Sequence, residues 1–297
     1  MAVRNIEEQL GQLNRVREAG RAEAAAALRK ALTDRVNLVV AKAANLAADL
    51  DLRDLIPNLL RAFDRLMEDA VKRDPQCWGK NAVAKALKQM EHRESPVFLR
   101  GARHVQMEPV WGGQEDTAAP LRGACLLALV ACTDLTRQEI LRHLVNAIAE
   151  TAAPVRVDAA RALGEMGGDD SVLLLRLKLR MGDPEPGVTG QAFESLLQLE
   201  RVQALPFVKE FLDSAGGDTA CEAALALGSS RLPGAVELLL EAWSRALGAE
   251  YRQALLRALS ISRQPEAIEF LVKLAAQGRA QDAADARAAL ALFPSAG

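Results

Sequence analysis

The chain reads Asp158-Ala159-Ala160-Arg161-Ala162-Leu163-Gly164 near its middle, and similar stretches occur at residues 191–196 and 222–228. Each copy combines small alanines with leucine, two residue types that favour helices and let them pack closely. A helical unit that returns at a period of about 20 to 50 residues is typical of a solenoid, in which each repeat packs mainly on its neighbours. The stretch therefore predicts an all-α repeat protein.

The leucine near the end of each predicted first helix gives the repeat length. Successive leucines are 41 and 42 residues apart at first and 31 to 34 residues apart later, at Leu46, Leu87, Leu129, Leu163, Leu196, Leu227, Leu259 and Leu290. Turns rich in Gly, Asp and Ser follow, and each leads to a second helix with apolar residues three and four apart, as at 140–145, 172–177, 236–240 and 268–272. We expect a right-handed α–α superhelix of about seven helical hairpins. Residues 1–34 are predicted to be capping helices, and residues 35–297 one continuous solenoid that ends in a half-repeat.

Composition supports a folded helical protein without a strong charge. Half of the 297 residues are hydrophobic, only 4% are aromatic, and the net charge is −2. Such a balance does not by itself indicate nucleic acid or an acidic membrane as a partner. The N-terminus carries acids in place of a signal peptide's apolar core, and no run of eighteen apolar residues occurs, so we expect a cytoplasmic protein with no membrane partner. The four cysteines form no Cys-x-x-Cys pair, which favours buried thiols.

The repeat resembles a HEAT repeat of a bacterial-type, bilin lyase-like kind. Residues 153–164 look like the first helix of such a repeat, and Asp183-Pro184-Glu185-Pro186-Gly187-Val188 looks like the turn between repeats. A weaker version of this turn occurs at Asp74-Pro75, and the resemblance extends over about residues 35–293. The resemblance implies a scaffold fold that carries many unrelated functions, so that fold alone does not decide the activity.

Patterns that would indicate catalysis are missing from the sequence. The three histidines, at 92, 104 and 143, lack metal-ligand spacing, no Gly-x-Ser-x-Gly motif occurs, and no glycine pair is followed by the Lys-Ser or Lys-Thr of a phosphate loop. Paired acids such as Asp169-Asp170 are expected to stabilise helix N-termini. We therefore expect no catalytic residue, no metal ligand and no cofactor.

Two tryptophans fall where the repeat is longest. Trp111 lies in an insertion at residues 106–117, and Trp78 lies at the preceding junction between repeats. Because connections of this kind emerge on one edge of a solenoid, we expect both residues on the same edge. Trp111 either folds back to fill the gap made by the insertion or contacts a partner. The third tryptophan, Trp243, is expected in the core, with Leu239 and Leu247 on its own helix face.

Basic residues on three successive second helices form a second candidate site. They are Arg100, Arg103 and His104, then Arg142, then Arg176 and Arg180. Later second helices carry mixed signs, which would cancel much of a field that attracts phosphate. These residues are either solvated helix faces or contacts for an anionic partner.

Three functions remain open from the sequence. The first is a non-enzymatic scaffold or adaptor that binds a protein partner through a concave face of second helices and the Trp111 loop. The alternative is a nucleic-acid-binding protein, including a base-repair glycosylase-like enzyme, which uses the basic residues. The third, which the resemblance alone implies, is an accessory subunit of a bilin lyase-type activity.

Overall fold

The computed structural model describes residues 2–213 and 217–292, and the chain divides into two compact units, residues 1–162 and 163–297. Within the described residues the regular structure is helical apart from one small antiparallel hairpin. The prediction of an all-α repeat protein is confirmed. The hairpin was not predicted, because the sequence shows no run of alternating β-branched residues there.

The first unit begins with two helices that cover the first repeat. They are α1 (Ala2–Asn14) and α2 (Arg21–Ala31), joined by the 3-10 helix η1 (Arg15–Glu18), and both contact α3 (Asn37–Asp49). The larger buried side chains of these three elements are Leu13, Val16 and Leu28.

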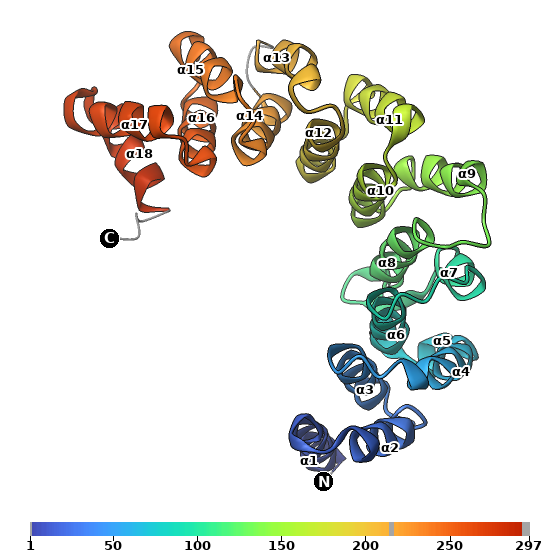
Figure 1. Cartoon of the computed structure of the whole chain (residues 1–297). Coiled ribbons are helices and arrows are strands. Elements are labelled where there is room, and N and C mark those ends of the chain that lie inside the picture. Colours follow the sequence, from blue (N-terminus) through green and yellow to red (C-terminus); the bar gives the residue numbers. More distant parts are fainter. Residues whose placement is uncertain (1, 214–216, 293–297) are drawn as a thin grey trace. The chain divides into compact units, whose positions relative to one another are not determined.

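Three helical hairpins follow in the first unit. Their elements are α3, η2 (Arg53–Leu55) and α4 (Ile56–Met67); α5 (Ala70–Arg73), η3 (Pro75–Cys77), α6 (Trp78–Gln89) and α7 (Pro96–Gly101); then β1 (Met107–Val110), β2 (Gly113–Asp116), α8 (Ala119–Leu129) and α9 (Arg137–Ile148). The first helices α3, α6 and α8 pack on one another in one row, and α4, α7 and α9 form a second row (Figure 1).

The second unit repeats this arrangement. The division falls within α10 (Ala153–Met166), and the later helices are α11 (Gly168–Met181), α12 (Pro186–Glu200), η4 (Arg201–Ala204), α13 (Leu205–Leu212), α14 (Asp218–Ser230), α15 (Ala235–Arg245), α16 (Ala249–Ser262), α17 (Pro265–Gln277) and α18 (Ala280–Ala291). The first helices α12, α14 and α16 pack in a row, and the lone α18 packs on α16 and α17.

The recurring leucines form the centre of the core. Seven of them, from Leu46 to Leu259, are at most 1% exposed, and Leu290 in the last helix is half-buried. Small residues bring the first helices close together. A Cβ atom on Gly228 of α14 would lie 2.2 Å from the carbonyl oxygen of Ala258 in α16, so only glycine fits at this crossing.

Two apolar assignments made from the sequence are wrong. Leu173 and Leu177 of α11 are 66% and 56% exposed, because Leu175 and Leu179 take the buried face. Leu247 is 97% exposed, because α15 ends at Arg245 before the helix face continues. Trp243 is buried, as expected, and the guanidinium of Arg252 lies 3.7 Å from its ring centre.

Candidate binding surface

The insertion in the first unit folds as a β-hairpin that presents Trp111 at its tip. Val110 pairs with Gly113 across a turn of Trp111 and Gly112, and the positive φ of Gly112 (92°) suits glycine. The Trp111 side chain is fully exposed, at 104% of its reference area. This exposure rules out the alternative in which Trp111 fills a gap in the solenoid.

Glu108 anchors the hairpin to the helices. It is only 5% exposed, and its Oε1 accepts hydrogen bonds from the Gln76 amide (2.7 Å), the Gln106 side-chain amide (2.6 Å) and the Thr117 hydroxyl (2.7 Å). Burial alone would raise the pKa of Glu108, but these hydrogen bonds hold it below its usual value. The carboxylate therefore stays charged and binds three segments of chain together.

A buried ion pair continues this network into α6. Lys80 and Asp74 have no exposed side-chain area, and Lys80 Nζ lies 3.1 Å from Asp74 Oδ2. Lys80 also donates to Gln106 Oε1 (2.8 Å), while Asp74 accepts from the amides of Gly79 (2.7 Å) and Lys80 (2.9 Å). Buried charges need partners of this kind, because each lost hydration shell must be replaced. The pair thereby joins the start of α6 to the base of the hairpin.

Arg122 of α8 holds the second strand at the base of the hairpin. It is 3% exposed, and its guanidinium contacts Asp116 Oδ2 at 2.6 Å and donates to the His104 carbonyl at 2.9 Å. Burial opposes ionisation of Asp116, but hydrogen bonds from the Gln106 amide and from Arg122 hold its pKa below the usual value. Both strands are thus fixed at the base of the hairpin, the first by Glu108 and the second by the contact between Asp116 and Arg122.

Trp78 lies on the turn that Glu108 binds. It is the first residue of α6 and is 49% exposed, directly after Gln76 and Cys77, whose φ angles are 60° and 54°. Together the two joined segments carry six exposed apolar side chains, which we call the Trp111 edge: Val71, Trp78, Val105, Met107, Val110 and Trp111. The structure thus brings the segments of both predicted tryptophans into direct contact.

The basic residues of the first unit do not form an unopposed positive surface. Arg100 is paired with Asp64 at 2.5 Å and lies over the ring of Phe63. The ring of His104 lies 3.1 Å from Gln106 Oε1, and burial lowers its pKa, which favours the neutral form. Arg103 and Arg142 are exposed. Of the four predicted residues here, two are therefore taken up by contacts within the protein.

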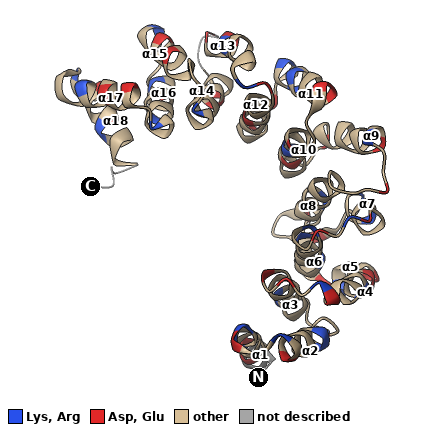
Figure 2. Cartoon of the chain, in the orientation of Figure 1, with Lys and Arg blue, Asp and Glu red and all other residues tan. Residues whose placement is uncertain are grey.

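The two arginines of the second unit are also partnered. Arg176 contacts Glu200 at 2.5 Å and Arg180 contacts Glu210 at 2.8 Å, and both guanidinium groups lie within 4.6 Å of the ring centre of Phe207. Figure 2 shows basic and acidic segments together on α11 and on α15. These arginines connect neighbouring repeats, and nothing in the sequence near them reveals partners 24 and 30 residues further on.

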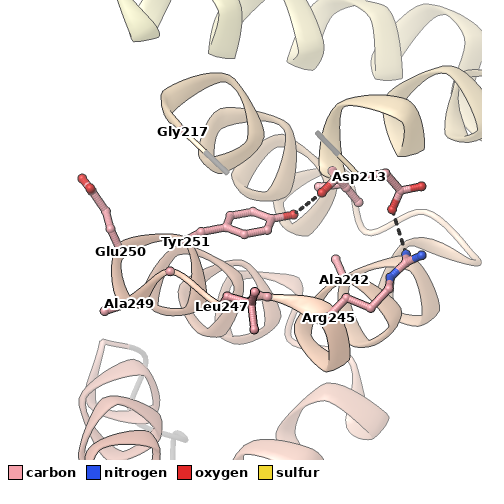
Figure 3. Close-up of a pocket in the computed structure, with 11 residues that line it drawn as sticks. Asp213, Gly217, Ala242, Arg245, Leu247, Ala249, Glu250 and Tyr251 are labelled. Carbon is pink, nitrogen blue, oxygen red and sulfur yellow. Dashed lines mark hydrogen bonds and ion pairs between the residues drawn. The ribbon is translucent and has the colours of Figure 1, made fainter. Parts of the chain in front are cut away.

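A hollow in the second unit lies at the end of α15 (Figure 3). Its volume is about 590 Å³, and its lining includes Leu212, Asp213, Arg245 and Tyr251. The Tyr251 hydroxyl donates to the Leu212 carbonyl (2.9 Å), and Arg245 donates to Asp213 (2.8 Å). Burial raises the pKa of Tyr251 to about 12. The Tyr251 hydroxyl and the side chains of Arg245 and Asp213 are thus already engaged within the protein.

Other reactive groups are sparse in the described part of the chain. Residues 2–213 and 217–292 contain no group of three His, Cys, Asp or Glu side chains that could hold a metal ion. The four cysteines are free thiols, and burial raises the pKa of Cys77 to about 12. Within the same residues no helix has the length and apolar character needed to cross a membrane.

Comparison with known proteins gives one family match, over a short stretch of the chain. Residues 155–179, which cover most of α10 and α11, match the model of the PBS lyase HEAT-like repeat. The match covers one helical hairpin of an all-α repeat protein. A solved structure of human deoxyhypusine hydroxylase in complex with glycerol is similar at 18% identity, with a TM-score of 0.32, over 84% of this chain and 88% of that one. No curated protein matches the chain.

Proposed function

We propose that this protein is a non-enzymatic binding scaffold that contacts a protein partner through the Trp111 edge. The observation that carries the proposal is the complete exposure of Trp111 on a hairpin whose base is a buried network of charged groups. A tryptophan in water leaves a large apolar surface unburied, and its burial in a pocket of another protein is strongly favourable.

The rigid base of the hairpin adds to this argument. Glu108, Lys80 and Arg122 fix the hairpin before any partner binds, so little conformational entropy is lost when Trp111 enters a pocket. Val110 next to the tip, Met107 at the base of the hairpin and Trp78 at the start of α6 supply further exposed apolar area. This combination of one large anchor and a preformed support is common at the centres of protein interfaces.

The other functions predicted from the sequence have less support. Three of the basic residues proposed to contact nucleic acid, Arg100, Arg176 and Arg180, form ion pairs with acids of the chain itself, which reduces their attraction for phosphate. The role in a bilin lyase-type activity rests on the name of the matched repeat model, and that model covers residues 155–179 alone.

The proposal is tested by comparing Trp111→Ala with a matched control. Leu247 is also a large apolar residue, is 97% exposed and lies in the second unit, so Leu247→Ala removes exposed apolar area elsewhere. We expect a protein retained from the source lysate by the wild type and by Leu247→Ala to be lost with Trp111→Ala. With the purified partner, the affinity should fall at least about thirtyfold. An unchanged set of retained proteins with Trp111→Ala would contradict the proposal.

A further inference from the structure

Helix α11 in the second unit has leucines on two opposite faces. Leu175 and Leu179 face the core and are at most 2% exposed. Leu173, Leu177 and Met181 are 66%, 56% and 75% exposed. Because residues four apart lie above one another on a helix, these three side chains form a continuous outward row, which we call the α11 ridge.

The other second helices of this unit carry charges at their outward positions. The exposed residues there include Glu210 on α13, Glu237 and Glu241 on α15, and Glu269 and Lys273 on α17. Charged outward faces are normal for helices that meet water. Among the described residues of α13, α15 and α17, the one exposed large apolar side chain is Val272, so the three-residue α11 ridge is a local exception. Such exceptions mark interaction surfaces.

The ridge has a hollow at one end and a flexible side chain at the other. A hollow of about 510 Å³ lies beside the N-terminal half of α11. Its apolar wall is Val172, Leu173 and Leu199, and the rest of its lining is Gly168, Asp169, Gln203 and the Arg176–Glu200 ion pair. Met181 is the last residue of the helix. Methionine adapts well to irregular apolar gaps. A hollow near the first turn and a methionine at the last turn fit each other when two copies of the helix run in opposite directions.

The charges on α11 also suit two copies of the helix that run in opposite directions. Asp169 is exposed in the first turn. Arg180 lies in the last turn, where it pairs with Glu210 at 2.8 Å and still keeps 52% of its side chain exposed. In an antiparallel pair of these helices, the acidic end of each lies toward the basic end of the other, and the two helix dipoles also oppose each other favourably. An interface between identical surfaces requires this kind of self-complementarity.

We propose that the α11 ridge is a self-association surface, against which a second copy of the chain packs its own α11 in the antiparallel direction. Leu177 of the two copies meets at the twofold axis, and Met181 of each copy enters the hollow beside Leu173 of the other. Rows of residues four apart pack as ridges into the grooves of another helix, at separations of about 8–10 Å. This surface is separate from the Trp111 edge and does not depend on it.

The test is the mass of the full chain in solution, measured by light scattering after size exclusion and by sedimentation. The wild type should be a dimer at concentrations on the order of 100 µM, and Leu177→Arg should weaken dimerisation at least about tenfold, because two apolar contacts are lost across the axis. Asp169→Arg should also weaken dimerisation, because it places a positive charge near Arg180 of the other copy. Val272→Arg is the matched control, because Val272 is an exposed apolar residue on α17 (53%) and lies outside the ridge.

Crosslinking supplies a second readout that does not depend on affinity. Leu177→Cys should form a disulfide-linked dimer under mild oxidation, and Val272→Cys should not, while circular dichroism checks that each variant remains helical. A wild type that stays monomeric at about 100 µM, which corresponds to a dissociation constant weaker than that concentration, would overturn the proposal. The same conclusion would follow if Val272→Arg disrupted the dimer as strongly as Leu177→Arg.

Discussion

The backbone amide of Gln76 donates a 2.7 Å hydrogen bond to the buried carboxylate of Glu108, and so connects the turn before α6 to the hairpin that carries Trp111. The two residues are 32 positions apart in the chain. The same carboxylate also accepts hydrogen bonds from the side-chain amide of Gln106 and the hydroxyl of Thr117. Glu108 therefore joins the two segments that make up the Trp111 edge.

Replacement of Glu108 by alanine should destabilise the first unit. The amide of Gln76, the amide of Gln106 and the hydroxyl of Thr117 would lose their acceptor in a buried place, which costs about 2–3 kcal/mol in the free energy of unfolding. Urea denaturation followed by circular dichroism measures this change. Glu115 faces Glu108 across the hairpin but is exposed, so Glu115→Ala is the control and should change stability by less than about 0.5 kcal/mol.

Replacement of Lys80 by methionine should have a larger effect. The change keeps the length of the side chain but leaves the Asp74 carboxylate buried without its cation, which costs about 3–5 kcal/mol. The control is Lys85→Met, since Lys85 lies exposed on the same helix. Thermal unfolding measures the stability of both variants. An equal loss of stability in the two would show that the buried pair is not what stabilises α6.

Glu108 should also make stability depend on pH. Its pKa is lower in the folded protein than its ordinary value of 4.5, so its contribution to stability is complete above that value. As the pH falls through 4.5, the unfolded chain takes up the proton first, and the contribution is lost as the pH passes through the lower, folded value. The difference in unfolding free energy between the wild type and Glu108→Gln should therefore shrink between pH 5 and pH 3. A difference that is constant over this range would contradict a lowered pKa.

Sequence patterns predicted the helices of this protein better than its contacts. The recurring leucines fixed the first helices, because a residue such as Leu163 must face the core in every repeat. The same reasoning failed at Leu173, where a helix with leucine at every second position offers two apolar faces and only packing decides between them. The hairpin was missed because its two strands have only four residues each.

The candidate site was predicted only in part, for a related reason. Trp78 and Trp111 stand out in a chain with three tryptophans, and a stretched repeat indicated their positions. The ion pair of Arg100 with Asp64 joins residues 36 positions apart, on neighbouring second helices. Such a partner becomes visible only when the rows of helices are assembled, so the basic residues looked more available in the sequence than they are.

The close crossing of α14 and α16 gives a final prediction. A Cβ atom at residue 228 would lie 2.2 Å from the carbonyl oxygen of Ala258, and backbone cannot move aside as a side chain can. Gly228→Ala should therefore push the two helices apart and cost about 1–3 kcal/mol in the free energy of unfolding. Gly187→Ala is the opposite case, because Gly187 lies in the first turn of α12 with no atom within 4 Å of its Cβ position.

Alanine at residue 187 should stabilise the second unit by about 0.5–1 kcal/mol, since it restricts the unfolded chain and favours the helix. Urea denaturation of the two variants compares Gly228, where a side chain would collide with α16, with Gly187, where a side chain has room. If Gly228→Ala were as well tolerated as Gly187→Ala, then the first helices would pack less closely than the structure shows. The predicted opposite signs follow from packing alone, because the chemical change is the same at both positions.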